Sequence, residues 1–187
     1  MHGRGGQGIV TLAELTALAA FDFGHEAQAI PSFGSERMGA PVLACCRVSD
    51  RPISSRQPVT RPDLVVVCDP TLLHSVQVFQ GLAATGWVLL NSSRPPAELG
   101  LSELSQWIPP EQLLTLPATE LARQIAGSTR ANSALLGGIA AVSGLFGMPA
   151  VGRALRRRFG EQLGDAQLAI AEAGFAAVSA TLAASHA

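Results

Sequence analysis

The chain contains neither lysine nor tyrosine, and all thirteen of its basic residues are arginines. The absence of lysine excludes a Schiff-base lysine and the lysine of a P-loop. Arginine suits bidentate recognition of carboxylates and phosphates, although a GC-rich genome would explain the same abundance of arginine and alanine. Composition therefore leaves anion recognition open.

Charge is also scarce. Charged residues make up only 14% of the 187 residues, hydrophobic residues make up 48%, and the net charge is −1. With so few charges to cover its surface, a chain of this size is expected to bury part of that surface against partner subunits. A net charge near zero gives no broad attraction to nucleic acid or to anionic lipid, so we expect neither as a partner.

The chain has only three cysteines, Cys45, Cys46 and Cys68, and none of them forms a CxxC pair. This number and spacing predict no iron–sulfur or zinc site, and the apolar surroundings indicate buried thiols in a reducing compartment. No apolar stretch reaches membrane-spanning length without a glycine or proline, and the amino end does not resemble a signal peptide. We therefore expect a cytoplasmic protein.

The order of apolar runs predicts an open α/β sheet. Residues 64–68 (LVVVC) form a continuous apolar run, typical of a parallel strand that is buried on both faces. Apolar residues recur at helical spacing from Ile9 to about Phe23, where Gly24 ends the predicted helix. The other predicted elements are strands at 26–30, 40–48, 87–91 and 113–116, an extended piece at 56–62 and a helix at 119–126.

The character of the chain changes after residue 130. Residues 132–146, 150–159 and 165–183 are predicted as three helices, separated by glycines and a proline. We expect one domain over 1–187, with a sheet part at about 1–127 and a helical part at about 128–187. The predicted fold class is an open, Rossmann-like and mostly parallel sheet with flanking helices and a helical carboxyl-terminal portion.

Residues 3–8 (GRGGQG) satisfy the G-x-G-x-x-G fingerprint and feed the first predicted helix. Glycines permit a tight turn and close backbone approach, and the amides at a helix N-terminus favour an anion. Two features argue against a standard NAD site. Only two residues precede the loop, where a strand is required, and the expected acid, Glu26, would begin the second strand when it should end it.

The motif HGRGGQG at 2–8 resembles the gamma subunit of the 2-oxoacid:acceptor (ferredoxin-type) oxidoreductases. Residues 31–42 (PSFGSERMGAPV) resemble a second motif of the same family, and the stretches at 62–70 and 130–137 also fit. The resemblance covers essentially the whole chain. An alternative relative, the smaller subunit of the indolepyruvate enzyme, carries a similar loop but a poorer match to the second motif.

Two departures from the family pattern stand out. Most relatives have a short strand before the glycine loop, and here we expect it to be missing, because the start was assigned too far downstream or because the strand is supplied differently. Met38 replaces the arginine that usually follows Glu36 and Arg37, which removes one positive charge from the predicted site.

The resemblance implies a subunit that is inactive alone, in an enzyme that oxidatively decarboxylates a 2-oxoacid with CoA to give acyl-CoA and CO2. The two low-potential electrons released in this reaction pass to an acceptor. It implies thiamine diphosphate with Mg²⁺ between alpha and beta subunits and iron–sulfur clusters in beta and delta subunits. Where NAD is the final acceptor, it implies a further NAD-linked electron-transfer subunit. The gamma subunit closes over the site and contributes to the CoA pocket, with CoA as a shared substrate. Pyruvate, 2-oxoglutarate, branched-chain 2-oxoacids and aryl-glyoxylates all remain open as the substrate. The composition, rich in alanine and arginine, mildly favours 2-oxoglutarate or an aryl-glyoxylate such as phenylglyoxylate.

The resemblance also suggests which residues face the ligand, with no catalytic or metal-binding residue among them. The glycine amides would meet the CoA phosphates, Arg4 would supply a counter-charge, and Gln7 would donate to the ligand or to a partner chain. Asn132, which begins a helix, has the alternative role of an N-cap. The predicted ligand-binding residues are Gly3, Arg4, Gly5, Gly6, Gln7, Gly8, Glu36, Arg37, Asn91, Ser92, Arg130 and Asn132.

Two of these choices have particular reasons or alternatives. Asn91 and Ser92 end a buried strand, where ligands of open α/β sheets gather. Glu36 and Arg37 are equally consistent with a local surface ion pair.

The arginine cluster at 153–158 is interpreted as a solvated or partner-facing helix face.

Two rival functions remain open from the sequence. One is a stand-alone Rossmann-type NAD(P) oxidoreductase, which would bind a dinucleotide by itself. The other is a non-catalytic assembly subunit whose glycine loop only packs against a partner.

Overall fold

The computed structural model describes residues 1–31, 38–55, 57–101 and 104–185. At its centre lies a six-stranded sheet in the order β2-β3-β1-β4-β5-β6. Its strands are β1 (His2–Arg4), β2 (Glu26–Pro31), β3 (Pro41–Ser49), β4 (Leu64–Val67), β5 (Trp87–Asn91) and β6 (Leu113–Leu116). The predicted α/β class with an open, mostly parallel sheet is confirmed.

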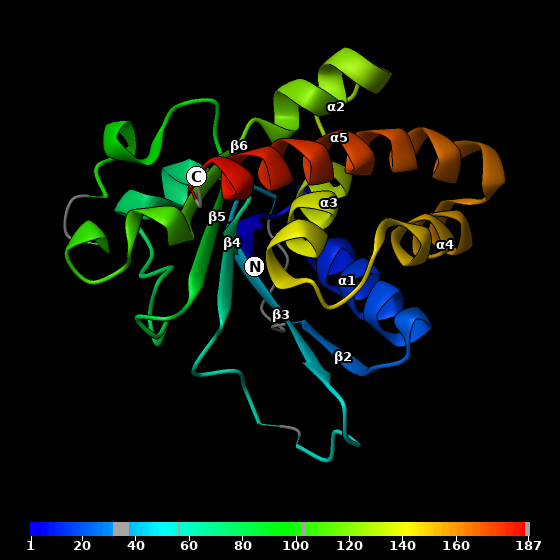
Figure 1. Ribbon diagram of the computed structural model, residues 1–187, viewed down its shortest axis with the longest axis horizontal. Coiled ribbons are helices and arrows are strands. Elements are labelled where there is room, and N and C mark those ends of the chain that lie inside the picture. Colours follow the sequence, from blue (N-terminus) through cyan, green and yellow to red (C-terminus); the bar gives the residue numbers. More distant parts are fainter. Residues whose placement is uncertain (32–37, 56, 102–103, 186–187) are drawn as a thin grey trace.

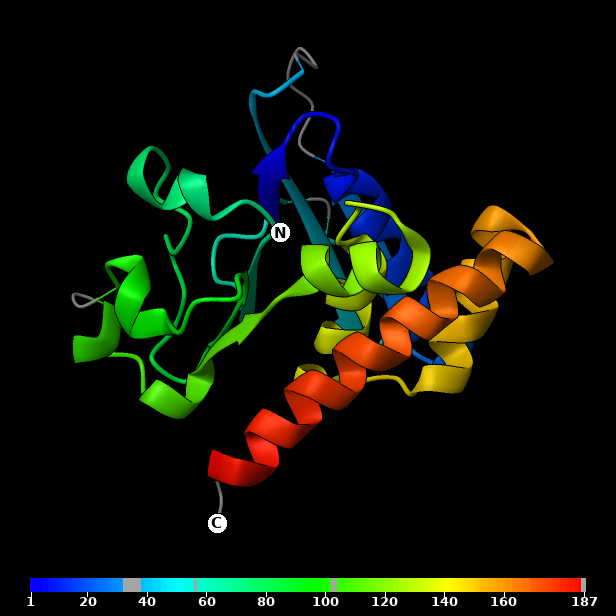
Figure 2. The same ribbon diagram turned by 90° about the horizontal axis from the view of Figure 1, so that it is seen from above.

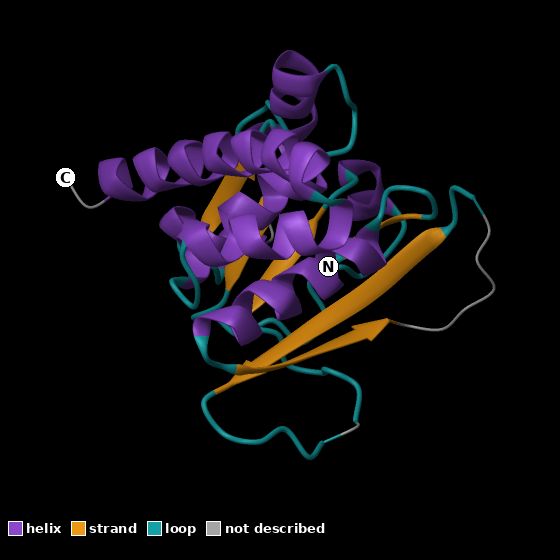
Figure 3. Ribbon diagram, turned by 90° about the vertical axis from the view of Figure 1, so that its right-hand side faces the viewer, coloured by secondary structure: helices purple, strands orange, loops and turns teal. Residues whose placement is uncertain are grey.

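The sheet has two parts joined by β1. Strands β1, β4, β5 and β6 run parallel to one another, whereas β2 and β3 form an antiparallel hairpin. Figure 3 shows this hairpin as the two longest strands, at the side of the molecule. Strand β1 pairs with β3 through Gly3 and Val42 and with β4 through His2 and Val67. The prediction that a first strand is missing is therefore wrong, because His2 to Arg4 themselves form it.

The five helices are α1 (Ile9–Phe23), α2 (Ala118–Ala126), α3 (Asn132–Ser143), α4 (Met148–Phe159) and α5 (Glu161–Ser185). All of them lie on one side of the sheet, and short 3₁₀ turns cover the other side (Figures 1 and 2). The predicted helices are present with boundaries shifted by a few residues. The predicted extended piece at 56–62 is not a strand where the structure describes it, at 57–62, since Pro58 and Pro62 remove two of the backbone donors that a ladder needs.

Alternating residues of the parallel strands feed two separate cores. Val66 and Leu89 face the helices, whereas Val65 and Val88 face the 3₁₀ side, where Leu72 and Ile108 complete the second core. This arrangement explains the continuous apolar runs, because each strand is covered on both faces.

Helix α3 is the buried centre of the helical layer, and α5 crosses it closely. A Cβ at Gly137 would overlap the carbonyl oxygen of Ala171, and one at Gly174 would overlap that of Ala134. Glycine is thus needed on both helices for their backbones to approach. Among the described helices, α5 has the length and apolar composition to cross a membrane, and 22% of its apolar window is buried within this fold.

Candidate functional site

The predicted glycine loop connects β1 to α1 at the carboxyl edge of the parallel strands. Gly6 and Gly8 have φ angles of +90° and +75°, the left-handed region in which side chains are disfavoured. The Gly5 amide donates to the Ala40 carbonyl at 2.9 Å, and the Gln7 amide donates to the Arg4 carbonyl at 3.0 Å. Within the described residues, the amides of Gly6 and Gly8 have no hydrogen-bond partner, so these two loop amides are available to a ligand.

Helix α1 adds further donors to the loop. Its first internal hydrogen bond runs from the Leu12 amide to the Gly8 carbonyl at 2.9 Å, which leaves the amides of residues 9–11 without a partner inside the helix. The first turn of α1 contains no acidic side chain. The positive end of the helix dipole is therefore uncompensated, as an anion-binding site requires.

A polar network ties the loop to the end of β4. Gln7 Nε2 donates to Asp69 Oδ2 at 2.8 Å, and Arg4 Nε lies 3.3 Å from the same oxygen. The Thr71 amide and hydroxyl donate to Asp69 Oδ1 at 3.0 and 2.6 Å. Arg4 also donates to the Thr71 hydroxyl and to the Gly39 carbonyl.

This network keeps Asp69 ionised. Burial by itself would raise the pKa of the Asp69 carboxyl, but the hydrogen bonds from Thr71 and Gln7 and the Arg4 guanidinium outweigh burial and hold that pKa below its ordinary value. Arg4 is thus balanced by an internal carboxylate. Burial also lowers the pKa of His2 to about 4, so this imidazole is neutral and adds no positive charge to the loop.

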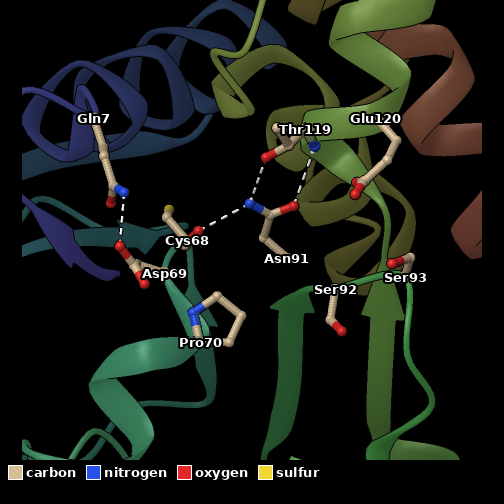
Figure 4. Close-up of a pocket in the computed structure, with 9 residues that line it drawn as sticks. All are labelled: Gln7, Cys68, Asp69, Pro70, Asn91, Ser92, Ser93, Thr119 and Glu120. Atoms are coloured by element: carbon tan, nitrogen blue, oxygen red, sulfur yellow. Dashed lines mark hydrogen bonds between the residues drawn. The ribbon is translucent and has the colours of Figure 1, made fainter.

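A pocket of about 340 Å³ opens beside this network, where the parallel strands end. Figure 4 shows its lining, with Gln7 and Asp69 on one side and Asn91 facing Thr119 on the other. Asn91 Nδ2 donates to the Cys68 carbonyl and to the Thr119 hydroxyl, both at 2.9 Å, and the Thr119 amide donates to Asn91 Oδ1 at 3.2 Å. The Asn91 side chain therefore fixes the spacing between β4, β5 and the start of α2.

The structure brings together most of the predicted ligand-binding residues that it describes. Gln7, Asn91 and Ser92 line the pocket directly. Asn132 reaches the loop from α3, donating from Nδ2 to the Gly8 carbonyl at 2.9 Å. Arg130 is exposed and outside the pocket lining. Glu36 and Arg37 lie outside the described residues.

The N-cap alternative for Asn132 is wrong. The N-cap of α3 is Ala131, and Asn132 directs its side chain away from its own helix to Gly8. A cap side chain bonds amides within its own first turn, so a bond to a carbonyl 124 residues away is a tertiary contact. The pattern of helix signals could not have revealed it.

Sequence reasoning missed Asp69, Thr71, Thr119 and Glu120 as parts of the site. Asp69 and Glu120 line the pocket together with Thr119, while Thr71 anchors the network behind it. A signal for Asp69 was available, because an acid that directly follows a buried parallel strand lies at the edge where ligands bind. Thr119 and Glu120 sit at the start of α2, and only the strand order shows that α2 begins beside this edge.

The geometry does not fit a dinucleotide site of the Rossmann type. Strand β2 pairs antiparallel with β3, so no parallel second strand follows α1. Glu26 pairs with Ser49, at the opposite end of β3 from Pro41, which pairs with Arg4. Eight residues of strand separate those two positions, roughly 26 Å, so Glu26 is out of reach of a ribose held at the loop.

Two arginines of the cluster on α4 are paired within the chain. Arg153 is ion-paired with Asp22, and Arg156 lies 2.7 Å from Asp165. The interpretation as a helix face is thus refined: half of this cluster fastens α4 to α1 and α5.

The fold and the site define an open-sheet α/β protein whose glycine loop presents free backbone amides at the carboxyl edge of the sheet. The family described as pyruvate ferredoxin/flavodoxin oxidoreductase matches residues 1–177. The chain belongs to this family, and its relatives identify it as a gamma subunit of the 2-oxoacid oxidoreductase type.

Three similar proteins illustrate the relationship. The gamma subunit common to the pyruvate and ketoisovalerate oxidoreductases of Thermococcus kodakarensis is 41% identical over 174 residues, covering 93% of this chain and 92% of the relative. The pyruvate synthase subunit PorC of Methanocaldococcus jannaschii is 38% identical with the same coverage. The crystal structure of the pyruvate oxidoreductase subunit PORC of Thermotoga maritima superposes with a TM-score of 0.78 at 29% identity, covering 94% of this chain and 92% of that one.

Proposed function

We propose that this gamma subunit forms one wall of the CoA site of a multisubunit 2-oxoacid:acceptor oxidoreductase, with its glycine loop on the phosphate groups of CoA. The observation that carries the proposal is a set of amides, at Gly6, Gly8 and the first turn of α1, that have no hydrogen-bond partner among the described residues. CoA brings several phosphate charges, and a helix N-terminus with free amides stabilises such charges.

The pocket beside the loop has a different task in this proposal. Asp69 and Glu120 both line it, and Arg4, the arginine that the described part of the chain brings to Asp69, is already balanced by that carboxylate. Two carboxylates repel a phosphate, so the phosphates belong at the loop. The pocket suits the neutral part of CoA, whose hydroxyl and amide groups find acceptors and donors at Glu120, Ser92 and Ser93.

The redox groups of the reaction belong to other subunits in this proposal. Thiamine diphosphate with Mg²⁺ would carry the carbanion chemistry of decarboxylation, and iron–sulfur clusters would carry the electrons. The cysteines of this chain do not suit an iron–sulfur cluster. Burial raises the pKa values of Cys46 and Cys68 to about 12, whereas clusters need thiolates, and the described residues contain no group of three potential metal ligands. Alpha, beta and delta subunits, and an NAD-linked subunit where NAD is the acceptor, would supply them.

Replacing Gly6 with leucine in the purified complex tests the CoA role. The left-handed φ of Gly6 and the side chain of Met38, whose Sδ would lie 3.0 Å from a Cβ, leave no strain-free place for leucine. We expect the KM for CoA to rise about tenfold or more, since losing amide bonds to a charged group costs on the order of 1.5–3 kcal/mol. The KM for the 2-oxoacid should change less than twofold.

Gly144→Leu is the matched control. Gly144 also has a left-handed φ, but it has open space around it and lies at the other end of α3, roughly 18 Å from Asn132. An unchanged KM for CoA and an unchanged rate of acyl-CoA formation in Gly6→Leu would remove the CoA role and leave the assembly role.

A further inference from the structure

The contact between Asn132 and Gly8 joins two layers of the molecule. Asn132 is the first residue of α3, and Gly8 is the N-cap residue that directly precedes α1. The Gly8 carbonyl accepts two hydrogen bonds, one from the Leu12 amide inside α1 and one from Asn132 Nδ2, both at 2.9 Å. The second bond fixes the direction of the peptide unit at which the loop turns into the helix.

Gly8 is shaped to receive this side chain. A Cβ on Gly8 would overlap Asn132 Nδ2, and the φ of +75° already disfavours any side chain. No side chain caps α1, because Gly8 is its N-cap residue. The orientation of the free amides at the start of α1 therefore depends on a contact from outside the helix.

Helix α3 is a rigid support for that contact. It is buried along most of its length, and its backbone meets α5 at Gly137 and Gly174 without intervening side chains. A side chain on such a helix holds its position better than one on a loop. The loop is therefore held by two tertiary hydrogen bonds, one from Asn132 to the Gly8 carbonyl and one from Gln7 to Asp69.

We propose that Asn132 is a positioning residue: it holds the Gly8 carbonyl so that the amides of the loop and of α1 point at the phosphate-bearing ligand. This inference rests on the proposed function, because it concerns the same site. Asn132 acts through Gly8 and makes no ligand contact of its own.

The test is made in the purified complex with Asn132→Ala and Asn132→Asp. Alanine removes the hydrogen bond. Aspartate keeps the shape but turns an acceptor toward the Gly8 carbonyl, and it places a negative charge beside the phosphates. We expect the KM for CoA to rise about fivefold in Asn132→Ala and more in Asn132→Asp, while kcat changes less than twofold. Thr129→Ala, an exposed change in the segment before α3, should leave both parameters unchanged.

Thermal unfolding separates positioning from simple support. In Asn132→Asp, the attraction of a carboxylate to the dipole at the start of α3 offsets part of its repulsion by the Gly8 carbonyl. Asn132→Asp should therefore unfold close to Asn132→Ala even though its KM is worse. If KM instead follows stability, with Asn132→Asp at least as good as Asn132→Ala, the positioning role is overturned.

A double-mutant cycle gives a readout that does not depend on CoA. Gly8→Ala should lower the unfolding temperature much less when Asn132 is already alanine, because the overlapping Nδ2 is then gone. Additive effects would overturn the contact on which the inference depends. If the cycle shows coupling but Gly6→Leu leaves the KM for CoA unchanged, the CoA assignment fails while the contact stands.

Discussion

Asp69 shows how single residues set the character of this site. Its carboxylate accepts hydrogen bonds from Gln7 and Thr71 and lies beside Arg4, so one side chain links the glycine loop to the turn after β4. Because these partners stabilise the charged form, the loop is held in place by an ion that must remain ionised.

Asp69→Asn should lower the free energy of unfolding by about 1–3 kcal/mol at neutral pH, since charge-assisted bonds are lost. The pKa of Asp69 is lowered in the folded state from 3.8, so its stabilisation is complete above the unfolded pKa and is lost as the pH falls through the folded pKa. The difference between the wild type and the variant, measured by urea unfolding, should therefore be constant above about pH 5 and should shrink below pH 3.8. A difference that does not vary with pH would show that the charge of Asp69 does not matter.

For single residues, the sequence predicted several members of the site but not which residues their side chains contact. The glycine loop was predicted from its glycine spacing before a helix together with its resemblance to the family motif, and Asn91 and Ser92 were predicted because a strand ends there. The partner of Asn132 lies 124 residues away, and no local pattern encodes a contact of that range. Arg4 was expected to face the ligand, but its pairing with Asp69 depends on how β1 and β4 align.

Among the elements, the crossing of α3 and α5 determines whether the helical layer can form. Gly137 and Gly174 allow the two backbones to touch, and α3 carries Asn132 to the loop. A side chain at either glycine has to separate the helices, since the overlapping atoms belong to the opposite backbone and cannot rotate away.

Gly174→Val should therefore destabilise the fold by about 3 kcal/mol or more, because overpacking against the Ala134 carbonyl outweighs the small gain in helix propensity of valine over glycine. Thermal unfolding measures the effect. Ala173→Val serves as the neighbouring control on α5, because Ala173 is half-buried and not at the crossing, and its cost should stay below about 1 kcal/mol. An equal loss of stability in the two variants would contradict the conclusion that Gly174 is required for the close approach of α3 and α5.

The elements were predictable where they were long and periodic. The helix from Ile9 to Phe23 has the predicted bounds, and the buried strands at 64–67, 87–91 and 113–116 stand out as continuous apolar runs. Strand β1 was missed because three residues, two of them counted as part of a loop motif, give no periodic signal. The antiparallel hairpin of β2 and β3 could not be told from parallel strands, since strand direction depends on pairing and not on composition.

The whole molecule presents several large apolar side chains to solvent. Phe21 and Phe23 are about 60% exposed at the end of α1, and Met38, beside the glycine loop, is 88% exposed. The low charge of the chain and these exposed groups favour burial against other subunits. The family relationship and this apolar surface both indicate that the chain contacts other subunits.

The most direct test of the proposed function uses the native assembly. The chain is purified from its own cells by a tag, and the subunits that co-purify with it are identified. Acyl-CoA formation is then assayed with a panel of 2-oxoacids that includes pyruvate, 2-oxoglutarate and phenylglyoxylate. We predict that the chain co-purifies with further subunits that carry thiamine diphosphate and iron–sulfur clusters. This complex should form acyl-CoA from one of the 2-oxoacids only when CoA and an electron acceptor are present. The chain alone should be inactive. A chain that purifies alone and oxidises a substrate with NAD(P) would contradict the account.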